Sequence, residues 1–479
     1  MNPIIERKLF FAMSGVQIAD GRIVTTDGTG DTRGRKHTEA AGVCLEWLNL
    51  ISRFYGSLYS ALLALAMLVS LPYWLFQMSV RGKYRKGFGE RMGRMAGRMR
   101  LPQGDEQVIW VHAVSVGEVL AVAGLVEQLN NQLHGRVFVS TTTDTGQALA
   151  RKRFGEKNVF YFPMDFGFAI RPYLRALRPK MVVIAETEFW PNFIRLAHAN
   201  GARIAVVNAR ISDRSWPRYR RFRGLLKKVL GDVDLFLAQT GEDATRLENI
   251  GASSERVRVI GNLKFDIPAP AAPAIVASAR KSIAENGSGP VLVCGSTVEG
   301  EEAIVLKAFE NVLVQHPRAV MILAPRHPER FAAVAALLEK MSIRYWKRSL
   351  WNGESLNAGV LLLDTIGELS SLYALADIAF VGGSLVPRGG HNIIEPALHG
   401  VATVVGTHTE NFRDIVRLFQ SRDAVRIAGP SDLPLVLMEL LNNDAERKAL
   451  GQRAAETMRS QLGATARALT ELEKLLTRA

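Results

Sequence analysis

Cysteine is nearly absent from this sequence, and acidic residues are in short supply. The only cysteines among 479 residues are Cys44 and Cys294, and they lie far apart. Such spacing excludes a disulfide framework and a cysteine-rich zinc site. Lysine and arginine number 60 against 46 acids, which gives a net charge of +14 and a pI near 9.9. This balance favours an anionic partner, namely a membrane surface, a phosphorylated substrate or a nucleic acid, without choosing among them.

Charge is completely missing from residues 54 to 80. As a helix, this run would span roughly 40 Å, against about 30 Å for the hydrocarbon core of a bilayer. Tyrosines and a tryptophan stand near its ends, where such rings favour the membrane interface. We therefore expect a membrane anchor. The alternative is a buried helix of a globular core, whereas a cleaved signal peptide would be shorter and nearer to the start of the chain.

The segment from Arg81 to Arg100 carries eight basic residues and a single acid, Glu90. The positive-inside rule assigns such a segment to the cytoplasmic side, and its charge suits anionic lipid headgroups. Residues 1–50 are polar, rich in glycine and without periodicity, which predicts a disordered extension. Residues 51–100 then form the predicted anchor with its basic flank.

Beyond residue 100, short runs rich in valine and isoleucine alternate with amphipathic stretches, which predicts parallel sheets covered by helices. The prolines at 268, 270 and 273 interrupt this alternation. We expect one α/β domain over residues 101–267, a linker over 268–289 and a second α/β domain with terminal helices over 290–479. Ligands of parallel sheets bind beyond the carboxyl ends of the strands, so the cleft between the two domains is the expected site.

A glycine loop follows one predicted strand in the second domain, in the stretch "FVGGSLVPRGGHNIIEPA". Glycine permits close backbone approach, and the following helix start and Arg388 both favour an anion such as a phosphate. Asn392 and Glu395 lie on the first turn of that helix, where a carboxylate could accept ribose hydroxyls. The same two residues also fit a capping box that needs no ligand, and the spacing does not decide between the interpretations.

Two more motifs follow strands of the second domain. Pro325 and Arg326 come directly after an apolar run, and arginine matches phosphate geometry with two parallel hydrogen bonds. Gly367 and Glu368 open a predicted helix after another run. Taken singly, Arg326 could equally be a surface ion pair, and Glu368 could be a first-turn acid that stabilises its helix.

Acidic and basic side chains also follow strands of the first domain. Glu118 starts a helix, where a general base could stand, although glutamate is common there without any catalytic task. Glu186 and Glu188 follow a second strand, and Lys264 follows the last one. Lys264 could stabilise charge on a leaving phosphate or could be an ordinary surface lysine. The six motifs converge on one site because all of them stand at strand ends.

Read together, "SVGE", "AETEFWPN", "NARISDRS", "GNLKFD", "GSTVEGEE", "PRHPERF" and the glycine loop resemble the Kdo (3-deoxy-D-manno-octulosonic acid) transferases of lipid A biosynthesis. The resemblance extends from about Leu58 to near the C-terminus. It implies the GT-B fold, with two Rossmann-like domains facing across a cleft. It also implies inverting transfer of Kdo from CMP-Kdo to the acylated, phosphorylated glucosamine disaccharide precursor of lipid A. The expected location is the cytoplasmic face of the inner membrane, in contact with its lipids, and no metal cofactor is expected.

The resemblance also assigns roles to residues. Glu118 matches the catalytic base, and Glu188 and Lys264 match residues that stabilise the transition state. The CMP-contacting positions match Pro325, Arg326, Ile366, Gly367, Glu368, Asn392, Ile393, Ile394 and Glu395. One departure stands out, because Val298 occupies a position where the family pattern has histidine.

Two other functions remain open on the sequence. Another GT-B enzyme could act on a lipid-linked acceptor with a different nucleotide-sugar donor, and competition between CMP and UDP or ADP would separate the two. A membrane-tethered adaptor could bind anionic lipid through residues 81–100, but it would leave the strand-end motifs unexplained. Nucleic-acid binding is not expected, because no recognised motif accompanies the positive charge.

Overall fold

The computed structural model describes residues 17–19, 22–24, 57, 59–72, 74, 76, 86–99, 106–132, 136–213, 215–266 and 274–477. The chain divides into two units, Met1–Gly82 and Lys83–Ala479. In the first, β1 (Gln17–Ala19) pairs antiparallel with β2 (Arg22–Val24), and residues 59–72 are helical. None of the helices in the described part of the chain is both long enough and apolar enough to cross a bilayer. Other parts of the expected extension, anchor and basic flank lie outside the described residues.

Seven strands of the described second unit form a first parallel sheet in the order β5-β4-β3-β6-β7-β8-β9. They are β3 (Val108–His112), β4 (Arg136–Thr141), β5 (Val159–Tyr161), β6 (Met181–Ala185), β7 (Arg203–Ala209), β8 (Leu235–Ala238) and β9 (Val257–Val259). Strands β3 to β8 are buried on both faces, as expected for a parallel sheet covered by helices, while the edge strand β9 is largely exposed.

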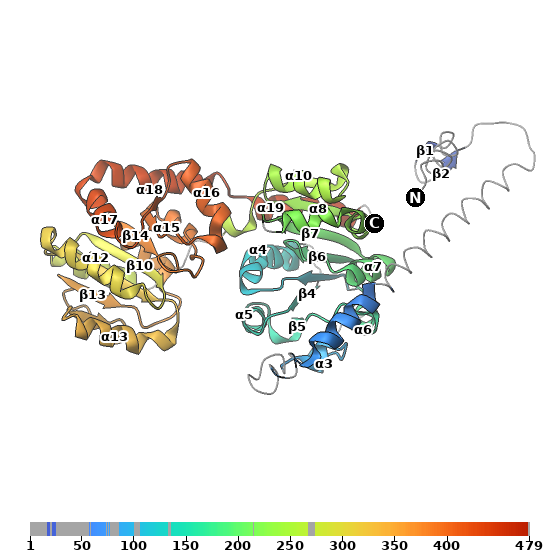
Figure 1. Ribbon diagram of the computed structural model, residues 1–479, viewed down its shortest axis with the longest axis horizontal. Helices are drawn as coiled ribbons and strands as arrows, with labels where there is room; N and C mark the ends of the chain where they lie inside the picture. The colour runs from blue at the N-terminus through green and yellow to red at the C-terminus, as the bar shows by residue number, and fades with distance from the viewer. Residues whose placement is uncertain are drawn as a thin grey trace, which may run out of the picture. The chain divides into compact units, whose positions relative to one another are not determined.

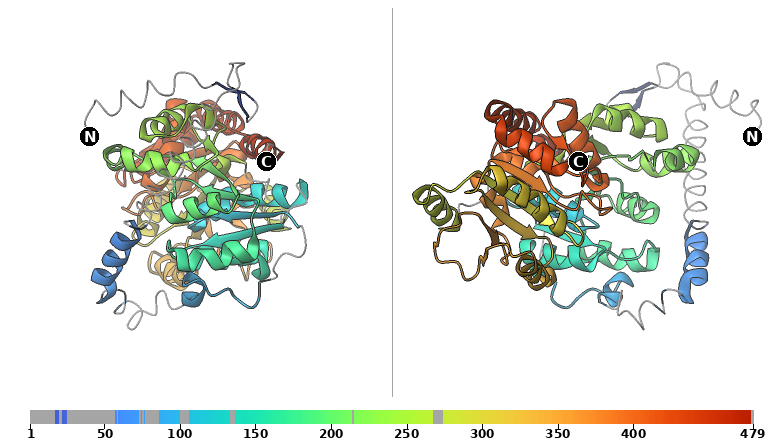
Figure 2. Two further views of the ribbon diagram at one scale, coloured as in Figure 1. Left: turned by 90° about the vertical axis from the view of Figure 1, so that its right-hand side faces the viewer. Right: turned by 60° about the vertical axis from the view of Figure 1, so that its left-hand side comes forward.

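Alternate residues of β3 enter different cores. Trp110 packs with helices α6, α7 and α10, whereas Ile109 and Val111 pack with α4 and α19. Figures 1 and 2 show the helices on the two sides of this sheet. The helices contributed by residues 86 to 251 are α3 (Phe88–Arg91), α4 (Val116–Gln132), α5 (Asp144–Phe154), α6 (Gly167–Leu177), α7 (Pro191–Ala199), α8 (Trp216–Arg221), α9 (Arg223–Gly231) and α10 (Gly241–Ile250).

A second sheet of seven parallel strands lies within the described residues, in the order β12-β13-β11-β10-β14-β15-β16. They are β10 (Val291–Thr297), β11 (Val320–Pro325), β12 (Tyr345–Lys347), β13 (Gly359–Leu362), β14 (Ile378–Val381), β15 (Ala402–Val405) and β16 (Arg426–Ile427). Its helices are α11 (Ala274–Glu285), α12 (Glu302–Gln315), α13 (Phe331–Lys340), α14 (Leu369–Leu372), α15 (Ile394–Leu398), α16 (Arg413–Ser421), α17 (Leu433–Asn442) and α18 (Asp444–Arg459).

Short 3-10 helices connect these elements. They are η1 (Glu156–Asn158), η2 (Ser254–Arg256), η3 (Leu263–Phe265), η4 (Pro328–Arg330), η5 (Tyr373–Leu375) and η6 (Glu410–Phe412). The sequence prediction of two α/β domains with parallel sheets is confirmed by the two sheets. Helix α11 occupies much of the predicted linker, and its Ile275, Val276 and Ala279 are buried against the second sheet.

The last helix, α19 (Ala464–Thr477), packs on the first sheet and not on the second. Its Ala468 and Leu472 are buried with Val119 and Val122 of α4, and the C-terminus lies beside this sheet in Figure 1. The carboxylate of Asp266 accepts hydrogen bonds from the backbone N–H groups of Gly463 (2.7 Å) and Thr465 (2.5 Å). The chain therefore crosses between the two domains twice, once after η3 and once before α19.

Candidate functional site

In both sheets some of the candidate residues stand where the winding direction reverses, whereas Lys264 follows the edge strand β9. Strand β3 lies between β4 and β6 in the first sheet, and β10 lies between β11 and β14 in the second. Connections on either side of such a strand run in opposite directions, which leaves space for a ligand at the carboxyl end. Glu118 follows β3, and the segments after β13, β11, β10 and β14 lie side by side.

The Glu118 carboxylate is fixed by its own helix start. Its Oε2 accepts a 2.7 Å hydrogen bond from the Val114 N–H, and its Oε1 accepts one from Ser115 Oγ at 3.0 Å. The turn between β3 and α4 therefore folds the side chain back on the strand end. Only 8% of the residue is exposed, so the carboxylate is largely removed from water.

The pKa of Glu118 is raised to about 7. Burial is the main cause, and the negative charges of Glu186 and Glu188 add to the rise, while the hydrogen bonds from Val114 and Ser115 act against it. A carboxylate with a pKa near the working pH is suited to accept a proton, because it is available as a base and yet holds the proton once transferred. The position predicted for a base thus has the electrostatics of one.

Two further acids follow β6, the neighbour of β3. The pKa of Glu188 is also raised, mainly by burial and then by the charge of Glu186. Glu186 adopts a positive φ of 57°, a conformation that costs free energy in residues other than glycine, and its N–H donates to the Val207 carbonyl. Its Oε1 lies 2.9 Å from Lys264 Nζ. The predicted catalytic residues Glu118, Glu188 and Lys264 are thus linked through Glu186, which the resemblance did not single out.

Side-chain amides hold Lys264 in place. Asn208 Oδ1 accepts a 2.9 Å hydrogen bond from the Leu263 N–H, and Asn262 Oδ1 caps η3 by accepting from the Lys264 N–H at 3.0 Å. The next residue, Phe265, is 2% exposed and packs in a cluster with residues of the second domain, including Val381 and Ile394. Two consecutive residues of η3 therefore reach different domains.

Pro325 ends β11, and Arg326 follows it at the surface. The Arg326 N–H donates to the Thr297 carbonyl at 2.8 Å, which joins the end of β11 to the end of β10. Burial lowers the pKa of His391, and the charge of Arg326 lowers it further; the same charge opposes the rise that burial causes in the pKa of Glu395. The guanidinium is therefore electrostatically coupled to the stretch that starts α15, as a shared anion site would require.

The contacts of Asn392 and Glu395 differ from those of a capping box. Asn392 Oδ1 accepts from the Ile394 N–H at 3.1 Å, and its Nδ2 donates to Glu395 Oε1 at 3.3 Å. Helix α15 has Ile393 as its N-cap, and no side chain caps it. Ile393 and Ile394 are each 1% exposed and belong to the core. Burial raises the pKa of Glu395, while Asn392 and Arg326 lower it. The carboxylate is thus held at a strand end with its charge partly compensated.

The stretch that includes Gly367 lies beyond β13, the neighbour of β11. Ile366 is 80% exposed, and a Cβ added at Gly367, where φ is +93°, would meet no atom within 4 Å. Glu368 Oε1 accepts from Arg348 at 2.9 Å, and its Oε2 accepts from Thr365 Oγ1. Glu368 therefore has ion-pair and hydrogen-bond partners, while Ile366 and Gly367 present open surface.

The glycine loop is occupied by a carboxylate of the chain itself. The N–H groups of Gly383, Ser384 and Leu385 all donate to the Glu301 carboxylate, at 2.6 to 2.8 Å. From the sequence we predicted that this loop binds an external phosphate, and the contact with Glu301 was not predicted. Nothing in the run of acids after β10 marks which one turns inward, because acids at a helix start are ordinary first-turn charges.

Val298 is 6% exposed, and its N–H donates to Glu301 Oε2 at 3.1 Å. The valine therefore keeps a backbone contact that any residue type could make.

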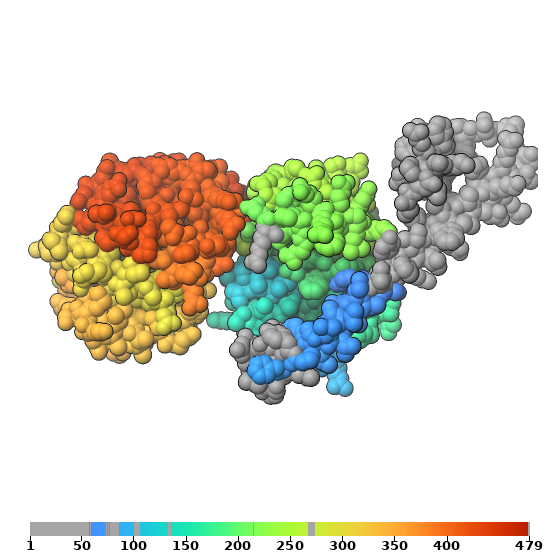
Figure 3. Space-filling model, in the orientation of Figure 1, coloured from blue at the N-terminus to red at the C-terminus, as the bar shows by residue number. Residues whose placement is uncertain are grey.

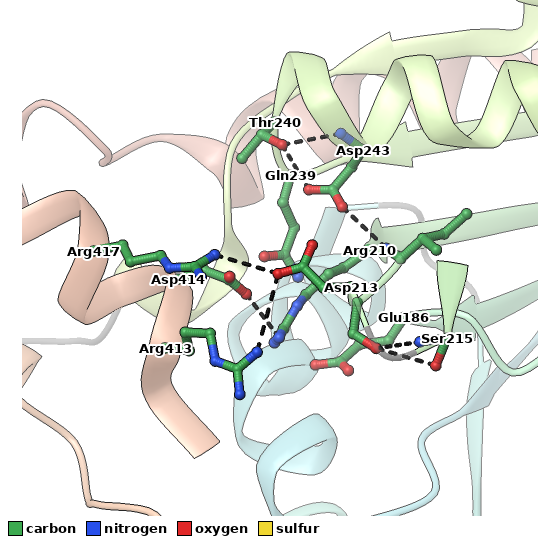
Figure 4. Close-up of polar contacts among 12 residues, drawn as sticks. Glu186, Arg210, Asp213, Ser215, Gln239, Thr240, Asp243, Arg413, Asp414 and Arg417 are labelled. Atoms are coloured by element: carbon green, nitrogen blue, oxygen red, sulfur yellow. Dashed lines mark hydrogen bonds and ion pairs between the residues drawn. The ribbon is translucent and has the colours of Figure 1, made fainter. Parts of the chain in front are cut away.

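Ion pairs join the loop after β7 to α16 of the second domain. Arg210 pairs with Asp414 at 2.7 Å, and Asp213 pairs with Arg417 at 3.3 Å and with Arg413 at 4.0 Å (Figure 4). Arg246 also pairs with Asp213 at 2.6 Å. These side chains are substantially exposed, apart from those of Arg210 and Arg246, so each pair contributes little stability alone.

Within the described ranges, no three histidine, cysteine, aspartate or glutamate side chains group as a metal site would require. The predicted residues fall into two sets. Glu118, Glu188 and Lys264 stand at the first sheet. The nine predicted nucleotide contacts stand at the end of β11 or after β13 and β14 of the second sheet, where β10 separates β11 from β14.

Comparison with known proteins agrees with this arrangement. Residues 86–267 match the family model of 3-deoxy-D-manno-octulosonic-acid transferase (kdotransferase). A 3-deoxy-D-manno-octulosonic acid transferase of Haemophilus influenzae is 34% identical over 83% of this chain and 93% of its own. The Bordetella pertussis enzyme of that name is 36% identical over 87% and 98%. A solved glycosyltransferase from Rickettsia africae covers 78% of this chain and all of its own, with a TM-score of 0.50 and 13% identity, which concerns the fold alone.

Proposed function

Since the chain belongs to the 3-deoxy-D-manno-octulosonic acid (Kdo) transferases, we propose that it takes Kdo from CMP-Kdo and that Glu118 is the base of an inverting transfer. Kdo transfer in lipid A and lipopolysaccharide biosynthesis is the function of this glycosyltransferase. The two parallel-sheet domains resemble GT-B enzymes. We further propose that donor and acceptor meet in the cleft between the two domains.

The observation that carries the proposal is the raised pKa of Glu118, about 7, in a carboxylate held by its own backbone. In the proposed step, an acceptor sugar hydroxyl attacks the anomeric carbon of Kdo. Its proton passes to Glu118 as the new carbon–oxygen bond forms. The bond from the anomeric carbon to the phosphate oxygen breaks, and CMP leaves with the bonding electrons.

Lys264 and Glu188 are proposed to stabilise this transition state. Lys264 carries a positive charge held between Glu186 and the end of the first sheet, so it can face developing negative charge. On the second sheet, Arg326 supplies positive charge for the CMP phosphate, and Glu395 and Asn392 supply polar groups for the nucleoside. These residues would carry the charge of the leaving group without a metal cofactor.

The acceptor is proposed to be the acylated, phosphorylated glucosamine disaccharide precursor of lipid A, at the cytoplasmic face of the inner membrane. The uncharged run of residues 54–80 would attach the chain to this membrane. Its basic flank, residues 81–100, suits the phosphates of both lipid and acceptor.

A second basic surface supports a location at the membrane. Helices α8 and α9 together hold six cations and no acid, in the green part of the surface in Figure 3. Between the cations, Phe222 and Leu225 are 53% and 45% exposed. Exposed apolar side chains among lysines and arginines are typical of segments that lie on an anionic bilayer.

The test is a transfer assay on the detergent-solubilised full chain, with CMP-Kdo made in situ and the products read by mass. A gain of one or more Kdo residues that is lost in Glu118→Ala is the expected result, and it also counts the additions. Competition by CMP, and not by UDP or ADP, would separate CMP-Kdo from the donors of other GT-B enzymes. Protein that transfers nothing from CMP-Kdo would refute the proposed donor.

Membrane attachment has its own test. We expect the full chain to stay with the membrane fraction after an alkaline carbonate wash. Its release by that wash would contradict an anchor. In the purified protein, replacing Phe222 and Leu225 by serine should weaken flotation with anionic vesicles, whereas neutral vesicles should show little difference.

A further inference from the structure

Glu301 is a completely buried carboxylate in the segment between β10 and α12. Its Oε2 accepts hydrogen bonds from the N–H groups of Val298 at 3.1 Å and Gly383 at 2.6 Å. Its Oε1 accepts from the N–H groups of Ser384 at 2.8 Å and Leu385 at 2.7 Å. A buried carboxylate is costly unless several donors replace the lost water, and four backbone donors do so here.

These four donors come from two loops. Val298 belongs to the loop after β10, and Gly383 to Leu385 belong to the loop after β14, the strand beside β10. One side chain therefore ties together the carboxyl ends of two central strands. The N–H groups of Gly383, Ser384 and Leu385 are not available to an anion from solution, because they already donate to the Glu301 carboxylate.

The same contact leaves no room for a side chain in the glycine loop. A Cβ added at Gly382 would stand 2.7 Å from Ser296 O and from Thr297 Cα, and 2.9 Å from Glu301 Oε2. Backbone, loop and carboxylate are packed in direct contact. The loop is consequently rigid at its base, despite its glycine content.

Two contacts connect the rigid base of the glycine loop to the residues that follow the loop. His391 Nδ1 lies 2.9 Å from the Gly382 carbonyl, and the Gly390 N–H donates to the Gly383 carbonyl at 2.7 Å. Both contacts pin the far end of the loop, which leads directly into Asn392 and Glu395. On the other side, the Arg326 N–H donates to the carbonyl of Thr297, the last residue of β10. Arg326 is thus attached to the strand end that precedes Val298, and Glu395 follows the glycine loop, so both stand next to segments that Glu301 holds.

The two neighbouring acids do not share this role. Glu302 is 1% exposed and pairs with Arg330 at 3.2 Å, and Glu299 is largely exposed and lies 3.5 Å from the same arginine. Both carboxylates therefore lie against Arg330, the residue that precedes α13. Within this acidic run, the loop contacts belong to Glu301.

We propose that Glu301 is a positioning residue of the nucleotide half of the site: it acts through the two loops to set Arg326 against the Asn392–Glu395 stretch. This inference rests on the proposed function, since it takes CMP as the ligand of those residues. Glu301 itself is shielded from the ligand and takes no part in the chemistry.

The test compares Glu301→Gln with Glu310→Gln in the full chain. Glutamine keeps the size of the side chain but turns an amide N–H₂ toward two backbone N–H groups. Glu310 lies on α12, pairs at the surface with Lys307 at 2.8 Å and serves as the matched control. CMP affinity is measured by calorimetry, and the KM of the donor and of the acceptor by mass-detected transfer.

We expect Glu301→Gln to weaken CMP binding and to raise the donor KM by at least tenfold, with the acceptor KM within twofold of wild type. Glu310→Gln should match wild type in all three. A folded Glu301→Gln protein that binds CMP within twofold of wild type would overturn the role of Glu301 and leave the donor assignment intact. Wild-type protein that does not bind CMP would refute the donor assignment and the positioning role with it.

Amide hydrogen exchange in the wild-type protein decides the case if Glu301→Gln does not fold. Peptides covering residues 383–385 should be protected without ligand and should change less than threefold with CMP, while peptides around Arg326 and Asn392 slow down. A slowing of more than tenfold at 383–385 on adding CMP would mean that these N–H groups bind the nucleotide, which would overturn the proposal.

Discussion

Lys264 Nζ and Glu186 Oε1 lie 2.9 Å apart, at the ends of two strands that are not neighbours in the first sheet. The ion pair spans 78 residues of sequence. It brings the cation assigned to the transition state next to the acid whose charge raises the pKa of both Glu118 and Glu188. Glu186 thus has two effects, since it holds Lys264 and it makes the neighbouring carboxylates more basic.

Replacing Glu186 by glutamine removes both effects, and the pH–rate profile and kcat report on them separately. Removal of the negative charge lowers the pKa of Glu118, so the acidic limb of the pH–rate profile should move to lower pH. The released Lys264 should also lower kcat, because its position is no longer fixed. The measurement is kcat and kcat/KM from pH 5 to 9. An unchanged acidic limb would show that the charge of Glu186 does not reach the base.

Glu118→Gln tests the base itself. The glutamine fits the same space but cannot take a proton, so kcat should fall by roughly 10² to 10⁴. In wild type, activity should rise with pH and level off above about 7, where Glu118 is ionised. The variant's residual activity should lack this rise. Normal turnover in Glu118→Gln would remove Glu118 from the mechanism.

The same substitution should change the pH dependence of stability. The folded-state pKa of Glu118, about 7, lies above its ordinary value of 4.5, so the folded form holds the proton more tightly than the unfolded form. Its contribution to stability is therefore complete below pH 4.5 and is lost as the pH rises through 7. At about 1.4 kcal/mol per pKa unit, the loss amounts to at most about 3.5 kcal/mol.

Glu118→Gln escapes this loss, because the amide does not ionise. Thermal unfolding at pH 5 and pH 8 should show the variant gaining on wild type at the higher pH. If the difference in unfolding midpoint between variant and wild type were the same at pH 5 and at pH 8, the raised pKa of Glu118 would be contradicted.

Arg326 and Arg388 were both candidates for the donor phosphate, and the structure distinguishes them. Burial is the main cause of the lowered pKa of His391 and of the raised pKa of Glu395, and the charge of Arg326 acts on both, which indicates that its charge lies close to the stretch predicted to bind the nucleotide. Arg326→Ala should therefore raise the donor KM by roughly 10- to 100-fold, on the basis that hydrogen bonds to charged groups are worth about 1.5 to 3 kcal/mol. Arg388→Ala should have a smaller effect. Steady-state kinetics with varied CMP-Kdo gives both values, and a larger effect at Arg388 would reverse the assignment.

Much of this site could be predicted because parallel strands send their carboxyl ends to one edge. The order of apolar runs located Glu118, Glu188, Arg326 and Glu395 at such ends without any knowledge of contacts. The resemblance added their roles. The sheets confirm the fold, while the roles remain predictions.

The contacts between these residues were not predictable from spacing. Lys264 meets Glu186 only because η3 is held by Asn208, an amide that the sequence presents as an ordinary strand-end residue. The glycine loop was assigned to a phosphate because glycine and a helix start favour anions in general. The anion present is Glu301, 82 residues away from Gly383 in sequence. Long-range pairing of this kind depends on which strands become neighbours, and local patterns do not encode that.

Phe265 offers a test of how the two domains communicate. It follows Lys264 directly, yet its ring is buried in a cluster with Val381 and Ile394 of the second domain. Phe265→Leu should cost roughly 1 to 3 kcal/mol of stability, because it removes part of a buried ring and leaves a cavity. It should also lower kcat, because η3 can shift and carry Lys264 away from Glu186.

Phe419 is the matched control, since it is equally buried in the same cluster but belongs to α16 and not to η3. Phe419→Leu should lose similar stability in thermal unfolding and keep its turnover. Both variants are assayed well below their unfolding midpoints with saturating donor and acceptor. Equal losses of kcat in the two would mean that the cluster serves stability alone; a loss confined to Phe265→Leu would make η3 the element through which the nucleotide domain sets the position of the catalytic lysine.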